Sequence, residues 1–123
     1  NLLELGILFD NDLWRQRAQS MITGLSNVAV KYPTSFGVWL DALYQSIKGT
    51  REIVLIGDYK EALDRLLHTT LPFSIIMASA KADSNYPLLK DKISDKPLSI
   101  FLCENYACRQ PVFQIEDLLK QLK

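Results

Sequence analysis

The hydrophobic pattern changes its period near residue 50, and this change narrows the folds that are open to the chain. The run EIVLIG (52–57) is short, continuous and rich in β-branched residues, as is typical of a strand buried on both faces. A second apolar run, FSIIM (73–77), follows a segment whose apolar residues have helical spacing. A strand–helix–strand order favours a βαβ unit, so we expect these two strands to be parallel.

The rest of the C-terminal part adds one strand and one helix. The run LSIFLC (98–103) predicts a third strand, and the apolar residues after residue 114 predict a final helix. Residues 79–96 are rich in Asp, Ser, Asn and Pro, so we expect a loop with one helical turn near residues 88–92. The expected fold class is α/β: an N-terminal helical segment packed on a small, mostly parallel three-stranded sheet, with helices after the first and third strands.

The residues before position 50 follow a helical period instead. Asn11 or Asp12 opens a helix whose apolar residues share one face, namely Trp14, Ala18, Met21, Ile22 and Leu25. After Pro33 another helix starts at Thr34 or Ser35 and stops at Gly49, with its apolar face formed by Phe36, Trp39, Leu40, Leu43 and Ile47. This spacing predicts core positions for both tryptophans. We therefore expect a helical segment at 1–49 and a small α/β domain at 50–123.

Charge and composition argue against two classes of partner. The chain has 14 basic and 14 acidic residues, whereas nucleic-acid binders usually carry a positive excess, so we expect no nucleic-acid partner. No apolar run approaches the roughly 20 residues that a membrane helix needs, and no signal-peptide pattern is present, so we expect no membrane partner. Two cysteines are too few for a disulfide scaffold, and we expect a cytoplasmic protein.

Cys103 and Cys108, in the string CENYACRQP (103–111), form the sharpest candidate site. A thioredoxin-type pair is separated by two residues at a helix N-terminus, whereas four residues intervene here and Cys103 ends a strand. A zinc site needs roughly four ligands, and His68 is the one further soft ligand that the chain offers. We favour two buried or half-buried structural thiols, with a reversible disulfide and a metal site as the alternatives. We expect no cofactor and no metal.

Gly57 and Asp58 form a second candidate, because they follow the first strand at the edge where open α/β sheets bind ligands. The glycine-rich loops of dinucleotide and nucleotide sites are absent, and Asp58 stands three residues before Glu61, the spacing of a capping box. We therefore favour a helix N-cap at Asp58. His68, the single histidine, belongs to no nucleophile motif, and we assign no catalytic residue.

Several strings carry a resemblance to a known family. They are FLCENYACRQP (101–111), EIVLIG (52–57) and, less specifically, LLELGILFDNDLWRQRAQSM (2–21) with YPTSFGVWLDALYQ (32–45). In order and spacing the chain resembles the C-terminal region of large thioredoxin-domain-containing proteins of the spermatogenesis-associated type. The resemblance implies a parent with an upstream thioredoxin-like domain and an α/α toroid similar to those of sugar epimerases and six-hairpin glycosidases. Residues 1–49 would then be the last helices of that toroid.

These considerations lead to a ranked set of functional expectations. The first is a non-catalytic C-terminal structural or interaction region of a larger multidomain protein, because no catalytic constellation is visible and the start LLELGILF (2–9) is strongly apolar. The alternatives are one part of a carbohydrate-active enzyme, epimerase- or glycosidase-like, and a thiol-redox element that uses Cys103 and Cys108. The expected partners are the remainder of the parent chain and a second copy bound through the apolar N-terminal helix.

Overall fold

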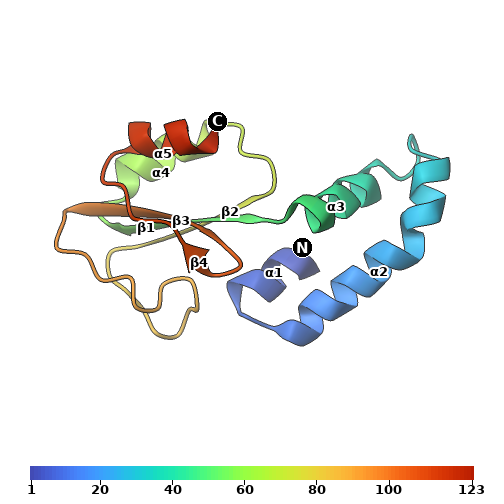
Figure 1. Cartoon of the computed structure of the whole chain (residues 1–123), viewed down its shortest axis with the longest axis horizontal. Coiled ribbons are helices and arrows are strands. Elements are labelled where there is room, and N and C mark those ends of the chain that lie inside the picture. Colours follow the sequence, from blue (N-terminus) through green and yellow to red (C-terminus); the bar gives the residue numbers. More distant parts are fainter. The chain divides into compact units, whose positions relative to one another are not determined.

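A computed structural model describes all residues from 1 to 123 and divides them into two compact units (Figure 1). The first unit, Asn1–Thr50, contains helices only, and the second, Arg51–Lys123, contains a β-sheet with two helices. The change of hydrophobic period near residue 50 therefore coincides with the change from helices to sheet.

The α/β unit is built on a four-stranded mixed sheet with the strand order β2-β1-β3-β4. The strands are β1 (Arg51–Gly57), β2 (Ser74–Ser79), β3 (Leu98–Glu104) and β4 (Ala107–Cys108). β1 and β2 pair in parallel as expected, but β3 is antiparallel to β1, and β4 is antiparallel to β3. The general α/β class is confirmed, whereas the prediction of a three-stranded, mostly parallel sheet is wrong.

The direction of β3 follows from the connection that precedes it. β2 ends beside Ile56 of β1, and β3 begins opposite Gly57, so both lie at the same end of the sheet. A parallel third strand would have required a crossover back to the other end, which usually takes a helix. Residues 80–97 contain no helix, and the loop holds one turn closed by the Lys90 N–H on the Tyr86 carbonyl oxygen at 3.0 Å.

Two helices of the α/β unit, α4 (Lys60–Leu67) and α5 (Ile115–Leu122), lie side by side over one face of the sheet (Figure 1). Alternate residues of β1 and β3 meet them, because side chains of a strand point to opposite faces. The buried cluster between helices and sheet consists of Ile53, Leu55, Ala62, Leu66, Ile100, Leu102, Ile115 and Leu118. An ion pair between Arg65 and Glu116 also joins the two helices at their surface.

The outer edge of β3 is covered by the chain that follows the hairpin. β4 pairs with only the last two residues of β3, Cys103 and Glu104. Beyond β4, the Arg109 N–H donates to the Leu102 carbonyl oxygen at 2.9 Å, and Ile100 and Val112 exchange backbone hydrogen bonds of 2.8 and 2.9 Å. The segment 107–112 therefore satisfies backbone groups along most of β3.

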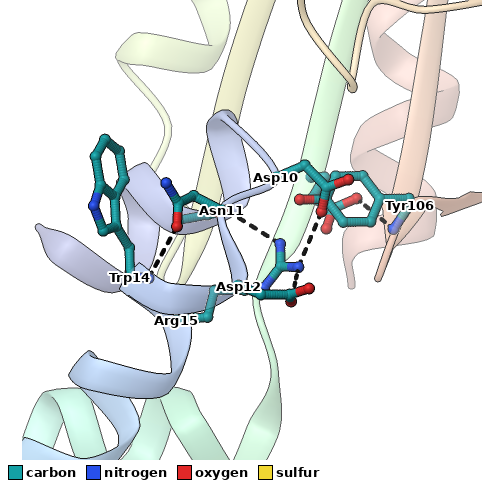
Figure 2. A network of polar contacts seen from close by, with 8 residues as sticks. Asp10, Asn11, Asp12, Trp14, Arg15 and Tyr106 are labelled. Carbon is teal, nitrogen blue, oxygen red and sulfur yellow. Dashed lines mark hydrogen bonds and ion pairs between the residues drawn. The ribbon is translucent and has the colours of Figure 1, made fainter.

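The helical unit contains α1 (Leu2–Leu8), α2 (Asp12–Lys31) and α3 (Gly37–Lys48). Asn11 is the N-cap of α2 and accepts a hydrogen bond from the Trp14 N–H at 3.1 Å, which confirms the expected helix start (Figure 2). α3 begins slightly later than predicted, with Phe36 as its N-cap, and ends at Gly49, whose φ of 85° suits glycine.

Arg15 holds the junction of α1 and α2 together (Figure 2). Its guanidinium donates to the Gly6 carbonyl oxygen at 3.1 Å and pairs with Asp10 at 2.9 Å and Asp12 at 2.5 Å. Gly6 is buried, and a Cβ atom placed on it would lie 2.7 Å from Arg15 Cγ. The two carboxylates thus neutralise an arginine that packs over a glycine.

The predicted apolar helix faces are only partly buried. α2 buries Ala18, Ile22 and Ala29, but the expected core residue Trp14 is 38% exposed and contacts the ring of Phe9 edge-to-face. α3 buries no residue completely, and Ile47, on its predicted apolar face, is 72% exposed. The prediction of a core position is wrong for Trp14, and Trp39 is only half-buried, because helical spacing identifies an apolar face without showing that a neighbour covers it.

Candidate functional site

The best-defined polar site of the chain lies at the β3–β4 hairpin. Asn105 and Tyr106 form its two-residue turn, with φ values of 50° and 62°. Positive φ at both central positions is the mark of the type I′ turn, whose twist matches that of paired antiparallel strands. The turn therefore fixes the register of the hairpin, and this register places Cys103 directly opposite Cys108.

Cys103 and Cys108 are joined by a disulfide bond, with 3.9 Å between their Cα atoms. The favoured prediction of two buried or half-buried free thiols is wrong, since the sulfurs are bonded and Cys108 is exposed; Cys103 is buried, as predicted. The sequence does contain a signal for this arrangement. In a hairpin with a two-residue turn, the residue two positions before the turn faces the residue two positions after it. The two cysteines of the string CENYAC (103–108) have this spacing.

The two sulfurs differ strongly in their access to solvent. Cys103 lies within β3 and is 1% exposed, whereas Cys108 lies in the edge strand β4 and is exposed. An external thiol would therefore meet Cys108 first, and the buried sulfur would be the leaving group. This difference in exposure determines which sulfur is attacked and which one leaves in thiol–disulfide exchange.

A buried carboxylate, that of Glu52, belongs to the same site. Glu52 is 2% exposed and is the register partner of Cys103 across the β1–β3 pair. Because Cys103 in turn faces Cys108, the three residues form one row across three strands; we call this the Glu52–Cys103–Cys108 row. Glu52 alternates with Ile53 and Leu55, so the row lies on the sheet face opposite α4 and α5.

The surroundings of Glu52 determine how it titrates. Burial raises its pKa above the ordinary value, and the nearby Glu104 carboxylate raises it further. The backbone N–H groups of Tyr106 and Asn105 and the ammonium group of Lys92 act in the opposite direction. The Tyr106 N–H donates to Glu52 Oε2 at 3.0 Å, so the carboxylate also supports the hairpin turn. The net result is a buried acid that retains its proton to a higher pH than an exposed glutamate.

Reasoning from the sequence missed Glu52, because we treated it as the first residue of a buried strand. A charged residue at the start of a continuous apolar run was the available signal, since glutamate is almost never fully buried without a partner. Its partners are the N–H groups of a turn more than fifty positions later, and the sequence does not show which turn that is.

At the second predicted site, the strand end at Gly57 and Asp58, the backbone of Pro97 approaches closely. The Asp58 N–H donates to the Pro97 carbonyl oxygen at 2.8 Å, and a Cβ atom on Gly57 would lie 2.1 Å from the same oxygen. Gly57 has a φ of 103°, so both its conformation and its close contact require glycine. The predicted N-cap is wrong, since Tyr59 is the N-cap of α4 and no side chain caps that end.

The remaining sequence candidates lie apart from the hairpin site. His68 is exposed at the end of α4, where its Nδ1 lies 2.8 Å from the Asp64 carbonyl oxygen of the same helix. No group of three or more His, Cys, Asp or Glu residues is arranged to hold a metal ion. None of the helices combines the length and the apolar character that crossing a membrane would require.

The helical unit presents an apolar surface of its own. A cavity of about 210 Å³ lies between its three helices and is lined mostly by apolar side chains, among them Leu3, Met21, Val38 and Trp39. Several large apolar residues of the helical unit are also exposed, on more than one side of α2 and α3. Taken together, we call them the helical apolar surface, defined by Leu13, Met21, Val30, Val38 and Ile47.

Comparisons with protein families, with curated proteins and with solved structures find no match to this chain. Its class is therefore described by its own architecture: a three-helix unit followed by a four-stranded mixed α/β unit that carries a disulfide-linked hairpin.

Proposed function

We propose that the chain is a non-catalytic interaction region of a larger cytoplasmic protein, and that its helical unit packs against further helices of the same parent chain. The observation that carries this proposal is the helical apolar surface. On the resemblance given above, the parent is a thioredoxin-domain-containing protein of the spermatogenesis-associated type, and the covering helices belong to its α/α toroid.

The burial pattern supports an apolar partner for these helices. The 20-residue α2 buries only Ala18, Ile22 and Ala29, two of which are small, and Val38 and Ile47 of α3 are 82% and 72% exposed. Removing apolar area from water contributes roughly 25 cal/mol per Å². A neighbouring helix with an apolar face would therefore gain stability from every one of these side chains that it covers.

The experiment compares the 123-residue chain with the product of its complete reading frame. Val38→Glu and Ile47→Glu should leave the unfolding temperature of the 123-residue chain nearly unchanged, because exposed positions tolerate substitution. In the complete protein the same changes should lower it by several degrees, because a buried, unpaired charge is costly.

Ile93→Glu is the matched control, since Ile93 is 83% exposed but lies in the α/β unit. Equal unfolding temperatures of all variants of the complete protein would contradict the proposal. Sugar or thiol turnover by the chain that is lost on a single side-chain change would contradict its non-catalytic part.

A second candidate function is thiol–disulfide exchange at the hairpin, and the disulfide itself favours it. In a reducing cytoplasm, disulfides of ordinary proteins are rare, and those that occur are usually transient, catalytic or redox-sensing. The exposed Cys108 and the buried Cys103 give such an exchange an entry point and a leaving group. Thiol titration before and after dithiothreitol should reveal two additional thiols, and a pair that resists dithiothreitol in the folded protein would exclude this candidate.

A further inference from the structure

We propose that Glu52 is the proton donor and acceptor for Cys103 when the Cys103–Cys108 disulfide exchanges with an external thiol. This inference rests on the second candidate function and assigns a chemical role to the Glu52–Cys103–Cys108 row.

The placement of the three residues is the first step. Register partners on adjacent antiparallel strands have Cβ atoms roughly 4.5–5.5 Å apart and project from the same face. Glu52 is such a partner of Cys103, and Cys103 of Cys108. Glu52 and Cys103 therefore project from the same sheet face on adjacent strands, while Cys108 lies one strand further out.

Exchange leaves a negative charge on the buried sulfur of Cys103, and Glu52 can neutralise it by giving up a proton. An external thiolate attacks Cys108 Sγ and forms a new S–S bond; the Cys103–Cys108 bond breaks, and its electron pair stays on Cys103 Sγ. At 1% exposure a thiolate at Cys103 would be poorly solvated, so this anion needs a proton. Protonated Glu52 supplies it, which leaves a neutral thiol and a carboxylate.

The remaining steps balance the reaction. A second external thiolate attacks the sulfur of the small thiol in the mixed disulfide, which releases Cys108 as a thiolate that solvent protonates. The net change is the reduction of the protein disulfide to two thiols and the oxidation of two external thiols to one disulfide. In the reverse direction the Glu52 carboxylate takes the proton from Cys103 as that sulfur attacks the mixed disulfide at Cys108.

The groups around Glu52 suit this role. Burial favours its neutral form, while the N–H groups of Asn105 and Tyr106 and the charge of Lys92 keep the carboxylate form accessible. From the neighbouring strands, β2 contributes the apolar Ile75 and β3 the second carboxylate, Glu104. Both protonation states of Glu52 are therefore available to a buried group, as a proton carrier requires.

If Glu52 only accepts the hydrogen bond that holds the turn, replacing it with glutamine should leave the exchange rates unchanged. Glu52→Gln retains a carbonyl oxygen that can accept the Tyr106 N–H but cannot carry a proton. Under the proposal, this variant reduces with dithiothreitol at least about 10-fold more slowly and reoxidises with oxidised glutathione more slowly by a similar factor. Its rates should also lose the part of their pH dependence that comes from a carboxyl group.

Glu61→Gln is the matched control, because it removes an exposed carboxylate on α4, on the other face of the sheet, and should leave the exchange rates within about twofold of the starting protein, well short of a general acid–base effect. Glu52→Asp retains a carboxyl group and should recover part of the pH dependence even if its rates are lower. Equal rates and pH profiles for Glu52→Gln and Glu61→Gln would overturn the inference while leaving exchange itself standing. A disulfide that is inert to dithiothreitol in every variant would overturn both.

Discussion

The Glu52 carboxylate accepts a hydrogen bond of 3.0 Å from the backbone N–H of Tyr106, across a sequence separation of 54 residues. One buried side chain of β1 thereby anchors the turn that sets the register of the Cys103–Cys108 pair. The stability of the hairpin and the titration of Glu52 are therefore linked, and the first prediction follows from this linkage.

Glu52→Gln should reduce the pH dependence of stability above the ordinary glutamate pKa. Because the pKa of Glu52 is raised in the folded state, the folded chain binds more protons than the unfolded chain between the unfolded value near 4.5 and the folded value. The free energy of unfolding therefore falls as the pH rises through this window, and the variant lacks this fall. Urea unfolding between pH 4 and 8 measures it.

Glu116 provides the comparison, because its pKa is shifted in the opposite direction. The hydrogen bond from Arg65 lowers this pKa, so its contribution is present above the unfolded value and is lost as the pH falls below it. Glu116→Gln should therefore alter the acid side of the profile only. A Glu52→Gln profile that parallels the starting protein above pH 5 would contradict the assignment.

Breaking the disulfide should destabilise the α/β unit moderately. The two cysteines are five positions apart, and closing so short a loop restricts the unfolded chain by only about 2 kcal/mol. Cys103→Ser with Cys108→Ser should lower the free energy of unfolding by about this amount without abolishing the fold, as urea unfolding followed by circular dichroism can measure. A loss of all β structure would show that the sheet depends on the bond.

Gly6→Ala and Gly24→Ala should have opposite effects on stability. A Cβ atom on Gly6 meets Arg15 Cγ at 2.7 Å and the Asn11 carbonyl oxygen at 3.3 Å, so overpacking should cost about 1–3 kcal/mol. Gly24, within α2, has nothing within 4 Å of the same position, and alanine there should stabilise the helix by about 0.5–1 kcal/mol. Thermal unfolding of both variants tests the α1–α2 junction, and a Gly6→Ala protein as stable as Gly24→Ala would show that this junction is loose.

The 123-residue chain should self-associate when it is separated from other partners. Its helical apolar surface exposes several large side chains, and such patches seek partners. Light scattering at millimolar concentration should report a dimer or a larger species, and Val38→Glu with Ile47→Glu should return it to a monomer. A strict monomer of the unmodified chain at that concentration would count against the use of this surface.

The local features of the fold could be predicted from the sequence, since local residues determine them. The strand EIVLIG (52–57), the Asn11 cap and the stop at Gly49 follow from patterns within a few residues, and the parallel β1–β2 pair follows from the order of consecutive elements. The features that were missed depend on residues far apart. The antiparallel direction of β3 depends on how the loop 80–97 returns, and the exposure of Trp14 depends on what covers α2.

Only part of the candidate site could be predicted, because the contacts that complete it join residues far apart in the sequence. Cys103 and Cys108 were identified, but their bond requires a turn at Asn105 and Tyr106, both in conformations that non-glycine residues seldom adopt. Glu52 could be connected with them only through the register of β1 against β3. No pattern within β1 contains this information.

Segment 107–112 leaves little room on β3 for the addition of a strand from another molecule. With backbone groups of Ile100 and Leu102 already bonded to that segment, a foreign strand finds few free donors and acceptors on that side. The opposite border of the sheet is β2, six residues long and parallel to its single neighbour. A peptide that extended this sheet would therefore find a longer strand to pair with at Ser74–Ser79 than at the two-residue β4, and its backbone could continue the ladder there.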